Sequence, residues 1–244
     1  MILQPILDTP ALFIYETKTL VISDLHIGIE KELREYGIYV SSKTWMMQQR
    51  LIDLCEEWKP EDLFILGDVK HTIPSFSYYE KKEIKNFFEA IKEYTRIHIT
   101  PGNHDGNLKK LLPNDIIIHP SDGFIFNNIG FLHGHRWPNE KLMNSRYIIF
   151  GHTHPSIQLT DRLGLPNMEP CWVKGFFYKD KTNEKYKTWN ENIEFIIIPT
   201  FNPLLGGIAV NKEGIVGPLK NIINLSEAQV YLLDGSSLGS IGNL

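Results

Sequence analysis

The segment "DLFILGDVKH" at residues 62–71 joins a run of apolar residues directly to a glycine and an aspartate. Short apolar runs bounded by turn-forming residues are typical of β-strands that are covered on both faces. Gly67 permits a sharp turn at the end of this run, so Asp68 lies at the exit of the strand. The segment therefore predicts a buried strand that ends in a side chain able to bind a ligand.

Two further strands are predicted, one on each side of this segment. "TLVISD" (19–24) and "RIHIT" (96–100) are short apolar runs that contain β-branched residues. Between the predicted strands, residues 41–58 and 77–94 carry apolar residues close to helical spacing. The alternation of strand and helix predicts right-handed parallel crossovers, and hence an α/β fold.

The two predicted helices are each expected to place one apolar face on this sheet. In residues 77–94 the spacing i, i+3, i+4 and i+7 is filled by Ile84, Phe87, Phe88 and Ile91. In residues 41–58 the apolar stripe is assigned to Trp45, Ile52, Cys55 and Trp58. Ser41 or Ser42 is the expected N-cap of this helix, and Pro60 lies beyond its end.

The second half of the chain is predicted to be mostly β-structure that packs on the first sheet. After Pro113, turn signals separate the strand-like segments "DIIIHP", "GFIFNN", "IGFLHGH", "RYIIFGH", "IEFIIIPT" and "GGIAVN". No low-complexity linker divides the chain, so we expect a single domain over residues 1–244. Residues 161–194 show no clean period and are expected to form an irregular excursion, either a hairpin or a functional loop.

The composition is that of an ordinary globular protein and argues against several other classes. No stretch approaches the roughly 18 apolar residues of a membrane span, and "MILQPILDTP" at the start lacks a basic leader and a cleavage site. We therefore expect a cytoplasmic protein that does not enter membranes. The two cysteines, Cys55 and Cys171, form no metal-binding spacing. The net charge of −4 provides no protein-wide attraction to nucleic acid.

Polar residues that can bind metals follow the predicted strands in a fixed order. The first three strands run into "SDLHIG", "LGDVKH" and "PGNHDG", and ligands of open α/β sheets bind at the carboxyl ends of strands. In "FGHTHPS" (150–156), His152 and His154 can share a face because alternate residues of a strand do so. An isolated residue of this kind is more often a cap or a turn, but the ordered set indicates one shared site.

This ordered set resembles the calcineurin-like metallophosphoesterase superfamily, through the blocks "DLHIG", "GDVKH", "GNHD", "HGH" and "GHTH" within residues 20–155. The resemblance implies a four-layer α/β/β/α sandwich, in which two mixed β-sheets are flanked by helices. It also implies two divalent metal ions. One ion would be held by Asp24, His26, Asp68 and His154. The other would be held by Asp68, Asn103, His133 and His152.

The chemistry of this donor set is that of a two-metal hydrolase. The carboxylate of Asp68 has two oxygens and a negative charge, so it is suited to bridge two cations. Oxygen and imidazole donors favour Mn²⁺, with Fe, Zn²⁺ or Ni²⁺ as alternatives, and the lack of thiolates argues against Cu(I) or an iron–sulfur cluster. Two metals about 3.5–4 Å apart can clamp a phosphoryl group and hold a bridging hydroxide as nucleophile.

Four further residues near these blocks are assigned to catalysis or to the surroundings of the metals. The resemblance implies that His104 faces the substrate and protonates the leaving oxygen. Asp105 either orients the ring of His104 or caps the segment that follows it. In "LHGHRW", His133 directly follows an apolar strand and is the expected ligand, so His135 is expected beside the ligands or facing substrate. His71 is expected to touch substrate.

The remaining features bear on the choice of substrate. "GDVKHTI" and "GNHD" depart from the Gly-Asp-x-x-Asp-Arg-Gly and Gly-Asn-His-Glu of the phosphoprotein phosphatases in this superfamily. The pattern is similar instead to compact prokaryotic phosphoesterases related to the nuclease subunit of double-strand-break repair. His98 and His119 lie outside every block and are expected to be structural.

Three functions follow from these observations. The leading hypothesis is a metal-dependent phosphodiesterase that acts on a phosphate ester, including those of nucleotides or nucleic acid. The second is a DNA endonuclease or exonuclease that works in a repair assembly. The third is a non-catalytic metal-binding module, which is disfavoured because none of the expected ligands is missing. Residues 161–194 are the expected substrate wall or homodimer contact.

Overall fold

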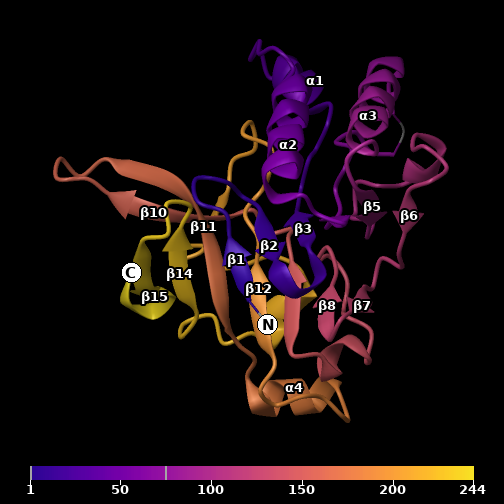
Figure 1. Ribbon diagram of the computed structural model, residues 1–244. Helices are drawn as coiled ribbons and strands as arrows, with labels where there is room; N and C mark the ends of the chain where they lie inside the picture. Colours follow the sequence, from indigo (N-terminus) through magenta and orange to yellow (C-terminus); the bar gives the residue numbers. More distant parts are fainter. Residues whose placement is uncertain (1, 75) are drawn as a thin grey trace.

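The chain folds into two β-sheets that pack face to face, with the longest helices outside the first sheet (Figure 1). This computed structural model describes residues 2–74 and 76–244. The first sheet has the order β1-β2-β3-β4-β5-β6, in which β3 to β6 are parallel and β1 and β2 are antiparallel. Its strands are β1 (Leu3–Pro5), β2 (Leu12–Ile14), β3 (Thr19–Ile22), β4 (Asp62–Ile65), β5 (Arg96–Ile99) and β6 (Ile117–Ile118).

The second sheet is mixed and has the order β13-β10-β11-β12-β9-β8-β7, with β14 beside β11 and β15 beside β14. Strand β9 is parallel to both β8 and β12, whereas β11 is antiparallel to its neighbours. Its strands are β7 (Phe124–Phe126), β8 (Ile129–Phe131), β9 (Tyr147–Phe150), β10 (Pro155–Thr160), β11 (Pro166–Phe176), β12 (Glu194–Ile197), β13 (Ile208–Ala209), β14 (Gln229–Leu232) and β15 (Ser237–Ser240).

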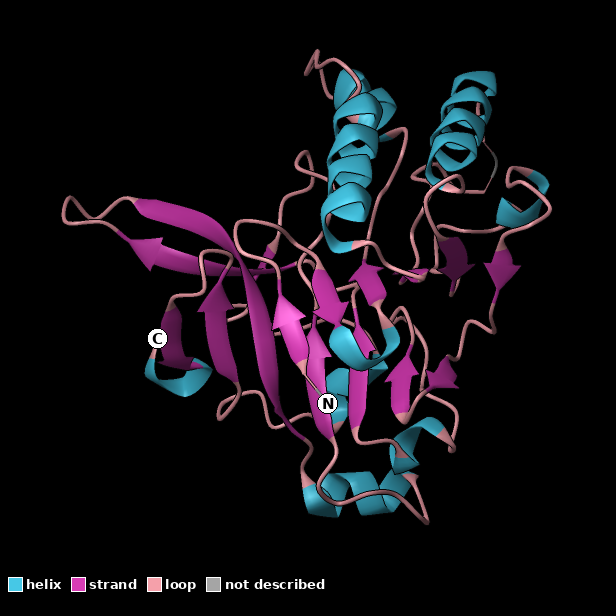
Figure 2. Ribbon diagram, viewed as in Figure 1, coloured by secondary structure: helices cyan, strands magenta, loops and turns pink. Residues whose placement is uncertain are grey.

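Alternate side chains of each strand point to opposite faces of its sheet, so they pack in different layers of the fold. Leu63 and Ile65 of β4 pack against the helices outside the first sheet, whereas Phe64 packs between the two sheets. In β9, Ile149 faces the first sheet and Ile148 faces outward. The hydrophobic cluster on the outer face of the second sheet also includes residues around helix α4 (Lys179–Lys185) and the 3-10 turn Pro218–Asn221. This arrangement confirms the predicted sandwich of two mixed sheets flanked by helical segments (Figure 2).

The longest helices are α2 (Thr44–Trp58) and α3 (Tyr78–Ile91), which stand side by side in Figure 1. The apolar face predicted for α3 is confirmed, because all four of its residues are fully buried. Ser77 caps α3 in a capping box with Glu80. The face predicted for α2 is wrong in part, because Trp45 is 67% exposed and the buried stripe consists of Met47, Leu51, Leu54 and Cys55.

The cause of this error is that α2 carries apolar residues on two adjoining stripes. The stripe at positions 47, 51, 54 and 55 has the tighter i, i+4, i+7, i+8 spacing and packs on the sheet. The cap also differs from the expected one, since Lys43 occupies the N-cap position. Ser42 instead contacts Glu83 of α3, with its Oγ 3.1 Å from the carboxylate.

Several short elements depart from the sequence prediction. Residues 161–194 are more regular than expected, because they contain the whole of the long strand β11 and the helix α4. Strand β6, from the segment "DIIIHP", joins the first sheet rather than the second. The sequence pattern also missed α1 (Ile29–Glu35), the β1–β2 hairpin and the β14–β15 hairpin. These elements are short, so periodicity has few residues from which to identify them.

The helices and the two cysteines bear on what was expected from the composition. Among the described residues, no helix is long and apolar enough to cross a membrane. Cys55 and Cys171 are both buried free thiols, and burial raises the pKa of each to about 12. They are packing residues rather than reactive nucleophiles.

Candidate metal centre

Loops after five strands, β3, β4, β5, β8 and β9, bring the predicted polar residues to one place. Backbone hydrogen bonds fasten these loops to one another. The amide of Asp24 donates to the carbonyl of Gly67 at 3.2 Å, and that of His26 donates to the carbonyl of Asp68 at 2.7 Å. The amide of Gly151 donates to the carbonyl of His133 at 2.9 Å, which joins the two loops from the second sheet.

One group of candidate ligands consists of Asp24, His26 and His154, whose ligand atoms lie within 4.8 Å of one another. Oδ1 of Asp24 is 3.2 Å from Nε2 of His154. These two atoms and Nε2 of His26 are buried, yet they form no hydrogen bond in the described chain. Buried polar atoms are normally hydrogen-bonded. Three donor atoms that converge without bonding one another fit a bound cation.

A second group consists of Asp68, His133 and His152, again with ligand atoms within 4.8 Å. Nδ1–H of His133 donates to the carbonyl of Leu66 at 2.8 Å, so in the neutral, metal-binding form of the ring the lone pair is on Nε2. This Nε2 lies 3.2 Å from Oδ2 of Asp68 and 3.2 Å from Oδ1 of Asn103. The predicted ligand Asn103 therefore joins this group.

Asp68 connects the two groups. Its Oδ2 lies 3.4 Å from Nε2 of His26 in the first group and 3.2 Å from Nε2 of His133 in the second. Its Oδ1 accepts a hydrogen bond from the amide of His104 at 2.8 Å. The structure thus brings the seven predicted ligand residues together, with Asp68 between the two sets. These residues fit a pair of divalent ions in charge, donor type and burial.

The backbone at the site is held in a conformation that is uncommon for residues other than glycine. Positive φ angles between 39° and 66° occur at Asp24, His26, Asp68, His152 and His154. Non-glycine residues of this kind are uncommon, and they cluster where the surrounding structure enforces a functional geometry. Five of the predicted ligands therefore share a backbone feature that the sequence pattern does not reveal.

Two glycines permit the loops to approach the carboxylates closely. A Cβ on Gly102 would lie 2.1 Å from Oδ1 of Asp68. A Cβ on Gly151 would lie 2.4 Å from Oδ2 of Asp24. Side chains at these positions would displace the two aspartates that the site depends on, so the glycines of "PGNHD" and "FGHTH" have a steric role.

The electrostatics of the site couple its carboxylates to its histidines. Burial raises the pKa of Asp68, but the neighbouring imidazoles of His133 and His26 outweigh it, and the pKa lies below its usual range. Burial lowers the pKa of His133, but Asp68 and Asp24 raise it to about 9. Burial and the charge of His133 lower the pKa of His152 to about 4. Protons and metal ions therefore compete for the same buried atoms.

His104 is placed at the edge of the first group. Its ring lies 4.7 Å from the ring of His26, centroid to centroid. Nδ1–H of His104 donates to the carbonyl of His71 at 2.5 Å. Because Nδ1 carries the hydrogen in this contact, Nε2 is the ring nitrogen that can exchange a proton with a substrate.

His71 contacts a ligand residue, His26, and an acidic residue that the sequence analysis missed. Its Nε2 lies 2.6 Å from the carboxylate of Glu32 on α1, and its Nδ1 lies 3.0 Å from Nδ1 of His26. The carboxylate accepts the hydrogen on Nε2 of His71. Nδ1 of His71 must then accept the hydrogen from Nδ1 of His26, which leaves a lone pair on Nε2 of His26.

Asp105 is buried and accepts hydrogen bonds from backbone amides. Its Oδ1 accepts from the amide of Val69 at 2.9 Å, and its Oδ2 accepts from the amide of Gly102 at 2.8 Å. It thereby fastens the turn after β5 to the loop after β4. Burial, together with the charge of Asp68, raises the pKa of Asp105 to about 6.

His135 lies beside the second group without being one of its three converging residues. Its ring is 5.2 Å from that of His133 and 6.1 Å from that of His152. Burial and the neighbouring charge of His133 lower the pKa of His135 to about 4. A neutral imidazole at this position is available as a hydrogen-bond partner for a substrate.

A segment after β12 supports the site and was not found from the sequence. Thr200 donates through Oγ1 to the carbonyl of Asp24 at 2.9 Å, and Asn202 donates through Nδ2 to the carbonyl of Leu25 at 2.7 Å. "PTFN" (199–202) belongs to none of the recognised blocks. Only the packing of the second sheet on the first brings these residues to the loop of Asp24.

His98 and His119 lie in a separate cluster. Nε2 of His98 is 3.0 Å from Oδ1 of Asp62, and its Nδ1 is 2.9 Å from Nε2 of His119. The ring of His119 stacks on Phe124, with centroids 3.5 Å apart and planes inclined by 7°. These contacts join the two sheets at their β5–β6 and β7 edges.

The fold and the converging donor atoms define a metal-dependent hydrolase. The family model of the calcineurin-like phosphoesterases matches residues 17–217. The chain therefore belongs to this family and is a metal-dependent phosphoester hydrolase. The resemblance stated from the sequence blocks is confirmed.

One solved structure shares the fold of this chain, and a second is less similar. The nuclease MPE of Pseudomonas putida is 21% identical, with a TM-score of 0.61 over 96% of this chain and 98% of that one. The phosphoesterase Yfce of E. coli is 14% identical, with a TM-score of 0.39 over 91% of this chain and 96% of that one. No curated protein sequence matches the chain significantly.

Proposed function

We propose that this protein is a two-metal phosphodiesterase. One metal would be held by Asp24, His26, Asp68 and His154, and the other by Asp68, Asn103, His133 and His152. The observation that carries the proposal is the convergence of Asp24 Oδ1, His26 Nε2 and His154 Nε2 beside an aspartate that reaches both groups. The three atoms are buried and form no hydrogen bond with the described residues. Oxygen and imidazole donors without thiolates support Mn²⁺ as the native ion.

The bound ions would supply Lewis-acid activation of water and of a phosphoryl oxygen. The side chains of this chain do the rest. Asp68 keeps its negative charge well below neutral pH, because its pKa is depressed by His133 and His26 despite burial. His104, oriented by the carbonyl of His71, donates a proton from Nε2 to the leaving oxygen.

The hydrogen-bond partners of His26 and His133 prepare them as ligands. The Glu32–His71 pair fixes the hydrogen of His26 on Nδ1, and the carbonyl of Leu66 fixes that of His133 on Nδ1. Both rings therefore present the lone pair of Nε2 to the site. Partners of this kind set the tautomer and orientation of metal-bound histidines. His71 is therefore proposed to act on a ligand, rather than on substrate directly.

The proposal is tested by hydrolysis of bis-p-nitrophenyl phosphate, p-nitrophenyl phosphate, cyclic nucleotides and DNA, each with added Mn²⁺. We expect the diesters to be hydrolysed faster than the monoester, and Asp68→Asn to abolish the activity. Equal rates for wild type and Asp68→Asn on every substrate would contradict the proposed chemistry. A preference for the monoester would retain the metal centre but overturn the assignment to diesters.

A nuclease is the second candidate, and exposed aromatic side chains favour it. Tyr36 and Tyr39 follow α1, which carries Glu32, and they are 75% and 81% exposed. Tyr78 begins α3, seven residues after His71, and is 85% exposed. Exposed aromatic rings on the segments that follow Glu32 and His71 suit stacking on bases of a single strand. The likeness in fold to the nuclease MPE is compatible with this candidate.

A further inference from the structure

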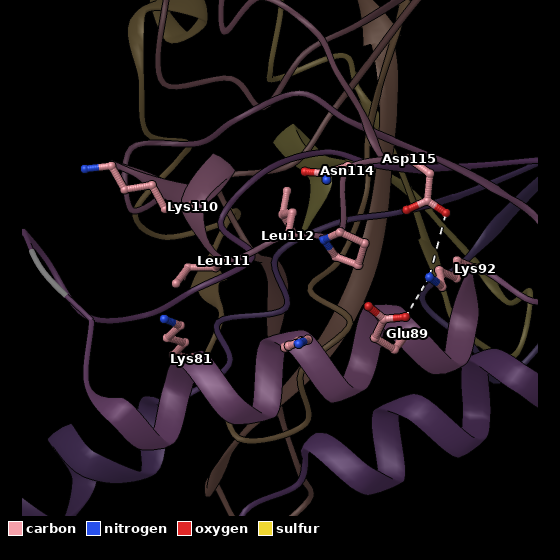
Figure 3. A pocket seen from close by; sticks show the side chains of 10 residues that line it. Lys81, Glu89, Lys92, Lys110, Leu111, Leu112, Asn114 and Asp115 are labelled. Atoms are coloured by element: carbon pink, nitrogen blue, oxygen red, sulfur yellow. Dashed lines mark ion pairs between the residues drawn. The ribbon is translucent and has the colours of Figure 1, made fainter.

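A cavity of about 530 Å³ lies between α3 and residues 110–115, outside the metal centre (Figure 3). We call it the lysine cavity. Four lysines and two carboxylates line it together with apolar and amide groups. The charged residues are Lys81, Lys85, Glu89, Lys92, Lys110 and Asp115.

The charges are unevenly distributed along the lysine cavity. Lys92 lies 2.6 Å from Glu89 and 4.0 Å from Asp115, so both carboxylates form their ion pairs with the same lysine. Within the described part of the chain, Lys81, Lys85 and Lys110 form no ion pair. Figure 3 places Lys81 and Lys110 at one end of the cavity and Asp115 at the other. One end is therefore cationic, although the whole protein has a net charge of −4.

The cationic end adjoins the loops of the metal centre. Lys81 follows Glu80, whose Oε1 accepts a hydrogen bond from the amide of Thr72 at 3.1 Å, and Thr72 is the residue after His71. On the opposite wall, Lys110 lies in the 3-10 turn Leu108–Lys110. The amide of Leu108 donates to the carbonyl of Asp105 at 3.0 Å, directly after His104.

We propose that the lysine cavity binds phosphates of a nucleic-acid strand next to the phosphodiester that is hydrolysed. This inference rests on the proposed phosphodiesterase function and names its substrate class. The metal centre provides the charge for one phosphate, so the lysines of the described chain that lack ion pairs beside it suit additional phosphates. Lys81 and Lys85 are one helical turn apart, about 6 Å along α3, which suits contacts with successive phosphates of a strand. Lysine binds phosphate as a point charge and does not read base sequence.

The test compares two triple variants that lose the same charge. Lys81→Gln/Lys85→Gln/Lys110→Gln removes the cationic end of the cavity. Lys181→Gln/Lys185→Gln/Lys187→Gln removes three exposed lysines in or just after α4, at the opposite end of the molecule (Figure 1). Binding of a fluorescent single-stranded DNA of about 16 nucleotides is followed by anisotropy over a range of salt concentrations, without added metal.

We expect the slope of log K against log salt to become less steep by about 2 in the cavity variant, because each phosphate contact on a single strand contributes about 0.7. The α4 variant is expected to keep the wild-type slope. With Mn²⁺, the ratio of kcat/KM for the oligonucleotide to that for bis-p-nitrophenyl phosphate is expected to fall at least tenfold in the cavity variant.

The outcomes separate this inference from the proposed function. If the wild type does not bind the DNA, or if both variants change the slope equally, the lysine cavity is not a strand-binding surface, whatever the diesterase assay shows. If bis-p-nitrophenyl phosphate is not hydrolysed while the cavity variant alone loses salt dependence, the cavity inference stands and the catalytic proposal fails.

Discussion

The protein contains two clusters built from aspartate and histidine side chains, and their contacts differ. At the metal centre, Asp24, His26 and His154 bring together atoms that make no hydrogen bond to any residue that the structure describes. In the other cluster, His98 bonds Asp62 through one ring nitrogen and His119 through the other. Composition alone does not separate these clusters.

The difference lies in whether each polar atom is satisfied by the protein. Nε2–H of His98 donates to Asp62, so Nδ1 of His98 accepts from Nε2–H of His119, and each of these hydrogens has a partner. Asp62 is further held by Arg96, with both Nε and an Nη 2.9 Å from its oxygens. A satisfied cluster stabilises the fold, whereas an unsatisfied one with converging lone pairs has room for a ligand.

The largest expected effect comes from replacing Asp68 at the metal centre by asparagine. The same replacement of Asp62 in the other cluster is the matched control. Asp68→Asn should lower kcat/KM for a phosphodiester by about 10³ or more, since the amide cannot provide two anionic oxygens and metal catalysis supplies several kcal/mol. Asp62→Asn should leave kcat/KM within about threefold and lower the free energy of unfolding by about 1–3 kcal/mol. Hydrolysis assays measure the activity of both variants, and urea unfolding measures their stability. Equal losses of activity in the two variants would contradict the predicted difference between the clusters.

A loss on the order of 10²-fold in kcat is expected for His104→Ala, which removes the general acid. The loss should be smaller with bis-p-nitrophenyl phosphate, whose leaving group needs no proton, than with a dinucleotide. His98→Ala, in the cluster of His98, His119 and Asp62, is the control. Any change in its kcat should be the same for both substrates. Steady-state kinetics on both substrates measures the contrast, and an equal loss on the two substrates would exclude an acid role.

The Glu32–His71 pair should affect metal affinity. Glu32→Gln is expected to weaken Mn²⁺ binding by about tenfold, at the low end for such partners because Glu32 is exposed. Glu35→Gln removes an exposed carboxylate from the same helix and should leave affinity unchanged. Isothermal titration with Mn²⁺ measures this, and equal affinities for both variants would show that the pair does not orient His26.

The smallest effect concerns pH and the satisfied cluster. Burial and the neighbouring His98 lower the pKa of His119 from 6.5 to about 4. The unfolded chain therefore binds more protons than the folded one between these values, so the stability that the neutral ring contributes is lost as the pH falls from 6.5 towards 4. As the pH falls over this interval, the free energy of unfolding of the metal-free His119→Gln variant should decrease less than that of the metal-free wild type. Urea titrations at several pH values test this, and parallel curves would contradict it.

Strand ends and ligand types were predictable from the sequence because they depend on local order. The parallel strands β3, β4 and β5 are apolar runs, and each leads directly into a polar block. The amphipathic helix α3 was equally clear because its apolar spacing allows only one buried face. Helix α2 was less clear because two stripes compete, and its buried face was settled by contact with the sheet.

The partners of the ligands were not predictable in this way. Glu32 lies on the seven-residue helix α1, which has no clear period, and its contact with His71 spans 39 residues. Thr200 and Asn202 contact the loop of Asp24 from more than 170 positions away. No motif spacing encodes such contacts, because they depend on how the two sheets are packed.

The sequence by itself determined the parallel order of β3, β4 and β5 and the chemistry of the residues that follow them, because hydrophobic runs and turn residues act over a few positions. Only the tertiary structure decided which nitrogen of each histidine is free, which carboxylate reaches both groups, and which lysines remain unpaired. Those properties arise from distances between segments that are remote in the chain, and desolvation then fixes their energies.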